Sequence, residues 1–193
     1  TDDAVVTAIS VAGGNPIVKG SVSMTSLFNN TDEVYCDGSV NRAADTAIVY
    51  CSYSMFGTPA YMVKISLTDM TIVKSVSAGK AHSMWLARAN PTLTWDEKSG
   101  TVAITLLASP GPPPAQPDSI FFFDDQTLEI VASAKLTGQL VMVETTVYDE
   151  KHSIAHLLAN NFDIVYSIDL ANRKVAGSTV FPNPSTNPIN QQF

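Results

Sequence analysis

Short apolar runs with turn residues at both ends recur along the chain. Examples are residues 47–50, 101–107, 119–123 and 162–168, which are rich in β-branched and aromatic residues and are bounded by Gly, Pro, Asn or Asp. Runs of this length and composition are typical of β-strands. Segments with the 3.6-residue period of an amphipathic helix are nearly absent, so the pattern predicts an all-β fold.

Two kinds of strand pair repeat along the sequence. A polar turn with the pattern aromatic-Asp-Glu-Lys occurs at 95–98 and 148–151, each time before a strand, and a weaker copy lies at 41–45. A second unit follows each turn: a strand ending in Asp or Ser, a short turn and another strand, at 62–75, 121–133 and 166–178. A fourth copy of this second unit lies at 7–21. Corresponding positions are about 45–58 residues apart, a spacing that indicates four-stranded blades.

Each repeat is therefore expected to form strand A, a polar turn, strand B, a loop, strand C, a short turn and strand D. This order resembles the blades of β-propellers of the broad YVTN and quinoprotein-like kind, from about Ala4 to Phe181. The resemblance implies one domain, 1–193, forming a β-propeller-like array of about three and a half to four four-stranded blades. The expected parts are a half blade (4–22), blades (32–77, 84–137 and 140–181) and a tail (182–193). A β-sandwich is the alternative fold.

The N-terminal half blade is a C–D hairpin without an A–B hairpin of its own. A lone hairpin is marginally stable, so we expect its apolar side chains to be covered. These side chains are Val6, Ile9, Val11 and Ile17. Three alternatives remain open: the tail after Val180 pairs with the hairpin, another chain completes the blade, or the sequence is a fragment of a longer protein.

The two cysteines, Cys36 and Cys51, fall in adjacent predicted strands. If Asn41 opposes Thr46 in an antiparallel hairpin, the same register places Cys36 opposite Cys51. Opposed Cα atoms lie about 4.5–5.5 Å apart, within the range that a disulfide requires. The register thus predicts a Cys36–Cys51 disulfide and favours a secreted or extracellular protein, against the alternative of two reduced thiols in the cytosol.

Two further features agree with secretion. The sequence begins with Thr1 rather than Met, so either a leader has been removed or the chain has been trimmed. Asn29 opens a glycosylation sequon with Asn30 and Thr31.

Composition excludes several classes of protein. The 193 residues carry a net charge of −7 with only 11 Lys and Arg, which argues against nucleic-acid binding and against attachment to anionic lipid. No apolar run approaches the roughly 18 residues that a helical membrane span requires.

Polar residues on the inner strands are the default ligand-binding candidates, because inner strands line the channel of a propeller. They are His82, Trp85 and Arg88 in one blade, Glu144 in the next, and Tyr35 and Asp37 in another. In YVTN-like blades, the family this chain resembles, a histidine often stands at the position of His82. A carboxylate in the channel, as at Glu144, is a candidate Ca²⁺ ligand or base. No other cofactor is indicated.

Other candidates lie in a loop and on strand B. Tyr53 and Phe56, in the loop between strands B and C, belong to a candidate recognition edge. His152 and His156 would be about 13 Å apart on a strand, too far to share a metal ion.

The sequence contains no nucleophile elbow, phosphate loop or zinc spacing. We therefore expect a secreted, non-catalytic binding or self-assembling module that meets proteins or its own copies through an open blade edge. The alternative is a small propeller hydrolase or lyase with a divalent cation in its central channel.

Overall fold

The computed structural model describes residues 5–10, 16–28, 34–41, 44–53, 59–80, 93–106, 119–136, 143–159 and 164–181. These residues form fourteen strands and one short 3₁₀ helix, Thr25–Leu27. The strands are β1 (Val5–Ser10), β2 (Ile17–Ser23), β3 (Val34–Asn41), β4 (Thr46–Tyr53), β5 (Pro59–Ser66), β6 (Thr71–Lys80), β7 (Leu93–Asp96), β8 (Thr101–Leu106), β9 (Ser119–Asp124), β10 (Ile130–Lys135), β11 (Val143–Asp149), β12 (Ile154–Ala159), β13 (Ile164–Asp169) and β14 (Lys174–Val180). No helix in the described ranges is long and apolar enough to cross a membrane.

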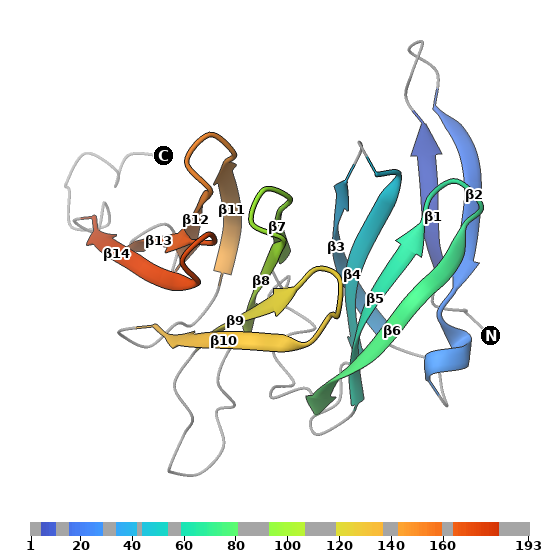
Figure 1. Ribbon diagram of the computed structural model, residues 1–193, viewed down its shortest axis with the longest axis horizontal. Coiled ribbons are helices and arrows are strands. Elements are labelled where there is room, and N and C mark those ends of the chain that lie inside the picture. The colour runs from blue at the N-terminus through green and yellow to red at the C-terminus, as the bar shows by residue number, and fades with distance from the viewer. Residues whose placement is uncertain are drawn as a thin grey trace, which may run out of the picture.

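The strands form four antiparallel sheets that follow one another in chain order (Figure 1). Sheet 1 is the β1–β2 hairpin, and sheets 2, 3 and 4 contain strands β3–β6, β7–β10 and β11–β14. Within each four-stranded sheet, strands adjacent in sequence are adjacent in space, which is the A-B-C-D order expected from the repeats. The all-β, propeller-like array is thereby confirmed, and the β-sandwich alternative is wrong.

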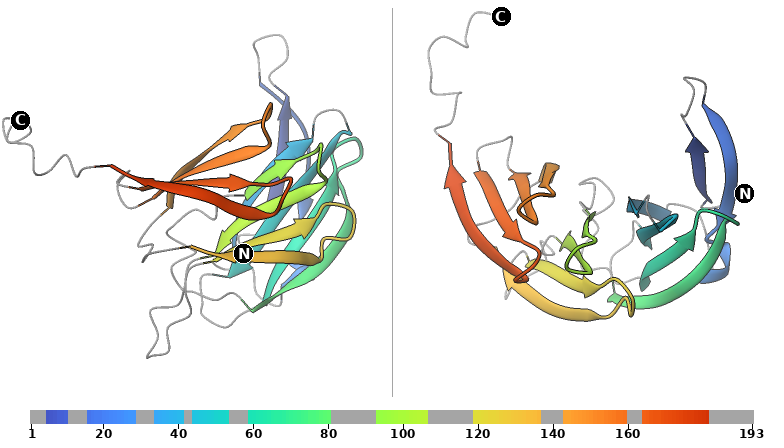
Figure 2. Two further views of the ribbon diagram at one scale, coloured as in Figure 1. Left: turned by 60° about the vertical axis from the view of Figure 1, so that its left-hand side comes forward. Right: turned by 45° about the horizontal axis from the view of Figure 1, so that its top comes forward.

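The sheets stand side by side along an open arc (Figure 2). The first strands of the complete sheets, β3, β7 and β11, lie on the concave side, and the last strands, β6, β10 and β14, lie on the convex side. This radial order makes β3, β7 and β11 the inner strands of a propeller.

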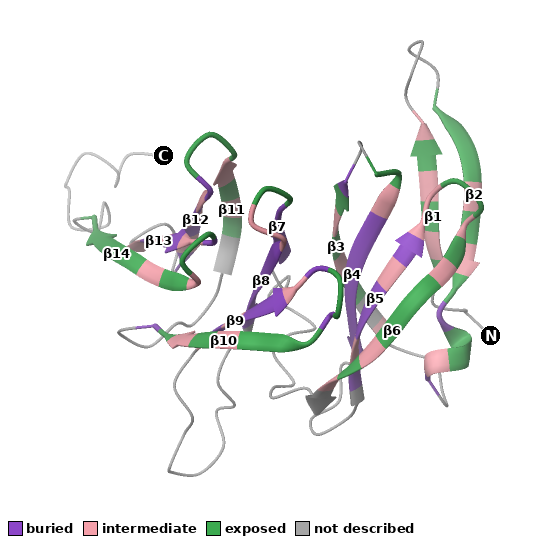
Figure 3. Ribbon diagram, in the orientation of Figure 1, coloured by how far each residue is buried: buried purple, intermediate pink, exposed green. Residues whose placement is uncertain are grey.

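Three apolar clusters hold consecutive sheets together. Figure 3 shows where buried residues lie along the strands. We call the side of a sheet that faces the next sheet in chain order its leading face, and the other side its trailing face. The alternation of side chains along each strand supplies both faces, since Val49 packs toward sheet 1 whereas Ile48 and Tyr50 pack toward sheet 3. Both faces of sheets 2 and 3 are therefore buried.

The tight turns repeat in their backbone conformation. A residue with positive φ stands before strand B in each complete sheet and another before strand D; these are Asp45, Gly100 and Ser153, and Met70, Leu128 and Arg173. Five of these six residues are not glycine, so the left-handed conformation is imposed by the turn rather than by residue preference. These equivalent turns support the repeat assignment made from sequence.

Sheet 1 differs from the expected pattern of burial. Val6 and Val22 pack against the cluster between sheets 1 and 2, but Ile9 and Ile17 are each 56% exposed. The prediction that Val6, Ile9 and Ile17 form one covered face is therefore wrong, because Val6 and Ile9 have opposite parity along the strand and the pairing shifts between Ala8 and Ile9. Val11 and the tail 182–193 lie outside the described residues.

Candidate functional site

The predicted disulfide is present. Asn41 pairs with Thr46 and Cys36 pairs with Cys51 across β3 and β4, and the two cysteines are bonded with their Cα atoms 4.2 Å apart. Cys51 is fully buried in the cluster between sheets 1 and 2. The disulfide thus connects the inner strand β3 to the apolar cluster that lies between sheets 1 and 2.

Most of the predicted ligand-binding residues fall outside what the structure describes. His82, Trp85, Arg88, Phe56 and the glycosylation candidate Asn29 belong to segments beyond the described ranges. The side chains of Tyr35, Tyr53 and Glu144 are not described either, although their backbones lie in β3, β4 and β11. Among the described side chains, no group of three or more His, Cys, Asp or Glu residues is arranged to hold a metal ion.

Glu144 lies at an irregular point of its inner strand. The pairing of β11 with β12 shifts between Val143 and Thr145, so Glu144 has no opposing residue on β12. Such bulges re-aim a side chain relative to its neighbours. The role of Glu144 as a ligand stays a prediction.

Asp37 is the inner-strand candidate whose surroundings are described. Its Oδ2 accepts a hydrogen bond of 2.8 Å from the backbone N–H of Leu93, the first residue of β7, and its Oδ1 accepts one from Gly38 N–H. Burial raises the pKa of Asp37 despite these two backbone hydrogen bonds, which act to lower it. Asp37 therefore joins the inner strands of sheets 2 and 3.

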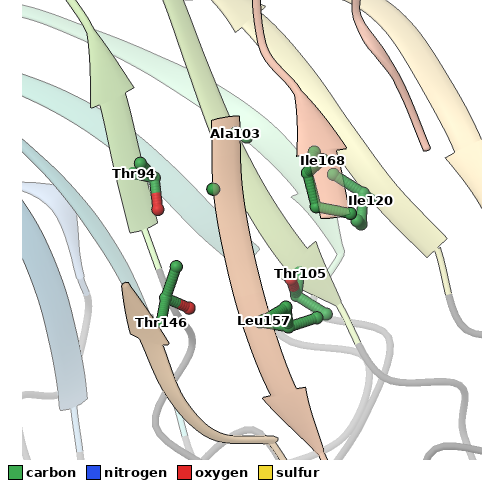
Figure 4. A pocket seen from close by; sticks show the side chains of 8 residues that line it. Thr94, Ala103, Thr105, Ile120, Thr146, Leu157 and Ile168 are labelled. Atoms are coloured by element: carbon green, nitrogen blue, oxygen red, sulfur yellow. The ribbon is translucent and has the colours of Figure 1, made fainter. Parts of the chain in front are cut away.

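A small cavity lies between sheets 3 and 4 (Figure 4). Its volume is about 10 Å³, and its polar lining comprises Thr94, Thr105 and Thr146. A cavity of this size suits about one water molecule, whereas small-molecule sites are roughly 300–1,000 Å³. It is therefore a packing feature of the sheet junction.

The junction between sheets 3 and 4 is built on the A–B turn of sheet 3. Asp96 is fully buried there, and its carboxylate accepts hydrogen bonds from Ser99 Oγ (2.6 Å), from the backbone N–H of Lys98 (3.2 Å) and from Tyr148 Oη (2.8 Å). Tyr148 belongs to β11 of the next sheet. Lys98 reaches in the same direction, because its Nζ donates to the backbone oxygen of Glu150 at 2.9 Å.

A second buried aspartate stabilises the junction between sheets 2 and 3. Asp125, in the β9–β10 turn, accepts a hydrogen bond of 3.0 Å from Trp95 Nε1. Lys64 on β5 of sheet 2 donates to the backbone oxygen of Asp125 at 3.1 Å, and its Nζ lies 6.0 Å from the centre of the Trp95 ring. The contacts that cross between sheets are thus made by the backbone oxygen of Asp125 and by the carboxylate of Asp96, with partners 61 and 52 positions away.

The A–B turn of sheet 4 repeats this arrangement, and no sheet follows it among the described residues. Asp149 Oδ1 accepts from the backbone N–H of Lys151 at 3.1 Å, and His152 Nδ1 lies 2.6 Å from Asp149 Oδ2. The hydrogen bond with His152 holds the pKa of Asp149 below its ordinary value. The Asp149 side chain is 40% exposed, whereas Asp96 is fully buried.

The leading face of sheet 4 is open and largely aliphatic. Val147 is 56% exposed, and Ile154, Leu158 and Val165 are half-buried. When sheets 3 and 4 are aligned on their A–B turns, Val147 is equivalent to Thr94. Thr94 is only 9% exposed because sheet 4 covers it. At the centre of this face, His156 Nδ1 lies 3.2 Å from Ser167 Oγ, within hydrogen-bond distance. His152 and His156 thus have separate partners, as their predicted distance implied.

The trailing face of sheet 1 is the second open end of the array. Val5, Ile9 and Val18 are 47%, 56% and 66% exposed, and Ile9 is paired with Val18 across the hairpin. Sheet 1 occupies the position of the outer C–D hairpin of a blade. Among the described residues, β1 pairs with β2 alone.

Solved structures similar to this chain are WD40 and quinoprotein β-propeller proteins. Sqt1 from Saccharomyces cerevisiae matches with a TM-score of 0.55 and 13% identity over 94% of this chain and 43% of Sqt1. Quinohemoprotein alcohol dehydrogenase from Comamonas testosteroni matches with a TM-score of 0.56 and 11% identity over 93% and 33% of the two chains.

These likenesses establish the fold class, a β-propeller array. The chain spans less than half the length of either similar structure. No protein-family model matches the sequence, and no curated protein is significantly similar to it.

Proposed function

We propose that the chain is a secreted, non-catalytic β-propeller module that binds protein partners, including its own copies, through the open ends of its sheet array. The observation that carries this proposal is the leading face of sheet 4. Its aliphatic side chains are exposed or half-buried at positions where the equivalent face of sheet 3 is buried by the next sheet. Exposed apolar surface of this kind is characteristic of interaction sites.

The disulfide supports the proposed compartment. Cys36 and Cys51 are bonded within one hairpin. Structural disulfides persist in oxidising compartments and are rare in the cytosol of most organisms. A net charge of −7 agrees with a soluble partner-binding module and disfavours attachment to anionic lipid surfaces.

The two open ends suggest how copies associate. In the array, a leading face always packs on the trailing face of the following sheet. A head-to-tail contact would therefore bring the trailing face of sheet 1, with Ile9 and Val18, against the outer part of the leading face of sheet 4, with Val165. Such a heterologous contact closes into a ring or continues as a filament, depending on the rotation between copies.

Sedimentation velocity over a range of protein concentrations tests self-association. We expect the average mass to rise above the 20.6 kDa of one chain as concentration increases. Ile9→Lys places a charge at an exposed position of the proposed contact and should keep the protein monomeric. Val73→Lys is the matched control, because Val73 is 60% exposed on the outer strand β6, away from both open ends.

Two results would contradict the proposal. One is a mass of 20.6 kDa at every concentration, which would remove self-association. The other is a rise in melting temperature on adding Ca²⁺ that disappears in Glu144→Gln, because this would favour the metal-dependent alternative.

A further inference from the structure

We propose that the β11–β12 turn and the inner half of the leading face of sheet 4 bind an A–B type β-hairpin of a partner protein. This hairpin presents a tyrosine hydroxyl to Asp149. The inference rests on the proposed function only in taking the chain as a binding module. It adds the kind of partner and the residues that recognise it.

The molecule itself contains the template for this contact. At the junction of sheets 3 and 4, the incoming A–B hairpin is β11–β12. It donates Tyr148 Oη to the carboxylate of Asp96 at 2.8 Å and offers the backbone oxygen of Glu150 to Lys98 Nζ at 2.9 Å. At this junction, one acceptor and one donor on the A–B turn of sheet 3 thus recognise the A–B hairpin of sheet 4.

Sheet 4 presents the same acceptor and donor. Asp149 and Lys151 occupy the places of Asp96 and Lys98, and in both turns the lysine backbone N–H donates to the aspartate Oδ1, at 3.1 and 3.2 Å. His152 occupies the place of Ser99, and both side chains lie 2.6 Å from the other carboxylate oxygen of their aspartate. The aromatic donor from a following sheet is the group that Asp96 has and that Asp149 lacks among the described residues.

Three apolar residues beside this turn, which we call the floor of the site, are equivalent to residues of sheet 3 that lie in its interface with sheet 4. Val147, Ile154 and Leu158 stand where sheet 3 has Thr94, Thr101 and Thr105, which are 9%, 0% and 5% exposed beneath sheet 4. At these three positions sheet 4 is therefore more apolar than the buried face of sheet 3, whose apolar contacts come from Ala103, Ile120 and Phe122. Its burial by a hairpin stabilises the contact through apolar area removed from water.

A second copy of the described chain does not supply this occupant. Its open end, sheet 1, is a C–D hairpin, and its three A–B hairpins (β3–β4, β7–β8 and β11–β12) each pack against the preceding sheet. Head-to-tail association therefore covers the outer half of the face and leaves the inner half for a hairpin of another protein. The same hairpin would lie beside the open edge of β1, where strand addition supplies backbone hydrogen bonds.

A cyclised peptide with the sequence of residues 145–158 is the probe, because this hairpin makes the template contact with sheet 3. Its binding to the 193-residue chain is followed by fluorescence anisotropy. We expect saturable binding that weakens roughly tenfold or more when the peptide carries Tyr148→Phe, since the lost hydrogen bond goes to a charged acceptor. Asp149→Asn in the protein should weaken binding similarly, and the two changes together should add little.

Further variants separate specific docking from general effects. Val147→Lys in the protein should abolish binding, since it places a charge on the floor of the site. Asp69→Asn is the control for Asp149→Asn, because Asp69 is an exposed turn aspartate of sheet 2 that accepts a hydrogen bond from Thr71. Each variant is first checked for an unchanged melting temperature, and the Tyr148→Phe change is made in the peptide so that the protein is not altered.

The inference is overturned if the peptide shows no saturable binding up to its solubility limit. It is equally overturned if binding is unaffected by Asp149→Asn and Val147→Lys. Self-association that persists without hairpin binding would refute this inference alone. Hairpin binding by a protein that stays monomeric would instead refute the self-association part of the proposed function.

Discussion

Replacing Tyr148 by phenylalanine removes one hydroxyl from the junction between sheets 3 and 4. The hydroxyl donates at 2.8 Å to Asp96, whose side chain is fully buried. A hydrogen bond to a charged group contributes about 1.5–3 kcal/mol, so we expect Tyr148→Phe to lower the free energy of unfolding by about 2 kcal/mol. For a chain of this length that corresponds to a fall in melting temperature of about 4–8 °C.

The pH dependence of this effect identifies its cause. Burial alone raises the pKa of Asp96, but hydrogen bonds from the side chains of Ser99, Tyr148 and Ser153 and from the Lys98 backbone together hold it below its ordinary value. A carboxyl whose pKa is lowered by folding contributes stability above its unfolded pKa of about 3.9, and this stability is lost as pH falls through the folded pKa. The difference between wild type and Tyr148→Phe should therefore be largest near neutral pH and should shrink below about pH 4.

Thermal unfolding followed by circular dichroism at neutral and acidic pH measures both quantities. Tyr61→Phe is the control, because the half-buried Tyr61 ring packs edge-on against Phe28 at 5.2 Å and its hydroxyl has no hydrogen-bond partner in the described part of the chain. An equal loss of stability in Tyr61→Phe, or a difference for Tyr148→Phe that stays constant into acid, would refute the reasoning.

Three further predictions concern stability. Replacing Cys36 and Cys51 by alanine removes a disulfide between residues 15 positions apart, which should lower the free energy of unfolding by about 3 kcal/mol. The change is measured as a lower urea midpoint, and an unchanged midpoint would contradict this prediction. Thr146→Val should stabilise the protein by about 1 kcal/mol because Thr146 Oγ1 is buried with no hydrogen-bond partner among the described residues, while Thr145→Val, at an exposed position, should have little effect in the same assay. Gly100→Ala should cost about 1–2 kcal/mol in thermal unfolding, because φ is +62° and the new Cβ would lie 3.3 Å from a carboxylate oxygen in the β9–β10 turn.

The sequence predicted the features that depend on neighbouring residues. A tight turn fixes the register of the hairpin that it closes, so the Asn41–Thr46 pair was sufficient to place Cys36 opposite Cys51. Repetition of the turn patterns was sufficient to order the strands within each sheet. These inferences needed contacts only between strands that are consecutive in the chain.

The junction residues depend on contacts between sheets and were not predicted. Asp96 and Tyr148 are 52 positions apart, and nothing in the residues around the Asp96 turn indicates which hydroxyl will donate a hydrogen bond to its carboxylate. One signal was available: Trp95 and Tyr148 stand at the same position of two repeats, and each donates from its ring to a turn aspartate. The Trp95 bond to Asp125 lies within sheet 3, however, and only the Tyr148 bond to Asp96 crosses between sheets, so the recurring aromatic residue alone does not mark a junction.

The composition of the terminal sheet bears on whether its open face is a cap or an interface. In repeat proteins a terminal unit that only ends the array needs a polar outer face. Sheet 4 instead has Val147, Ile154, Leu158 and Val165 across three strands of its leading face, while the buried leading face of sheet 3 has threonines at the first three of these positions. Because the open face is more apolar at these three positions than a face that another sheet already covers, its composition is that of an interface rather than of a polar cap. Asp149 and Lys151 at its edge then determine which kind of hairpin that interface accepts.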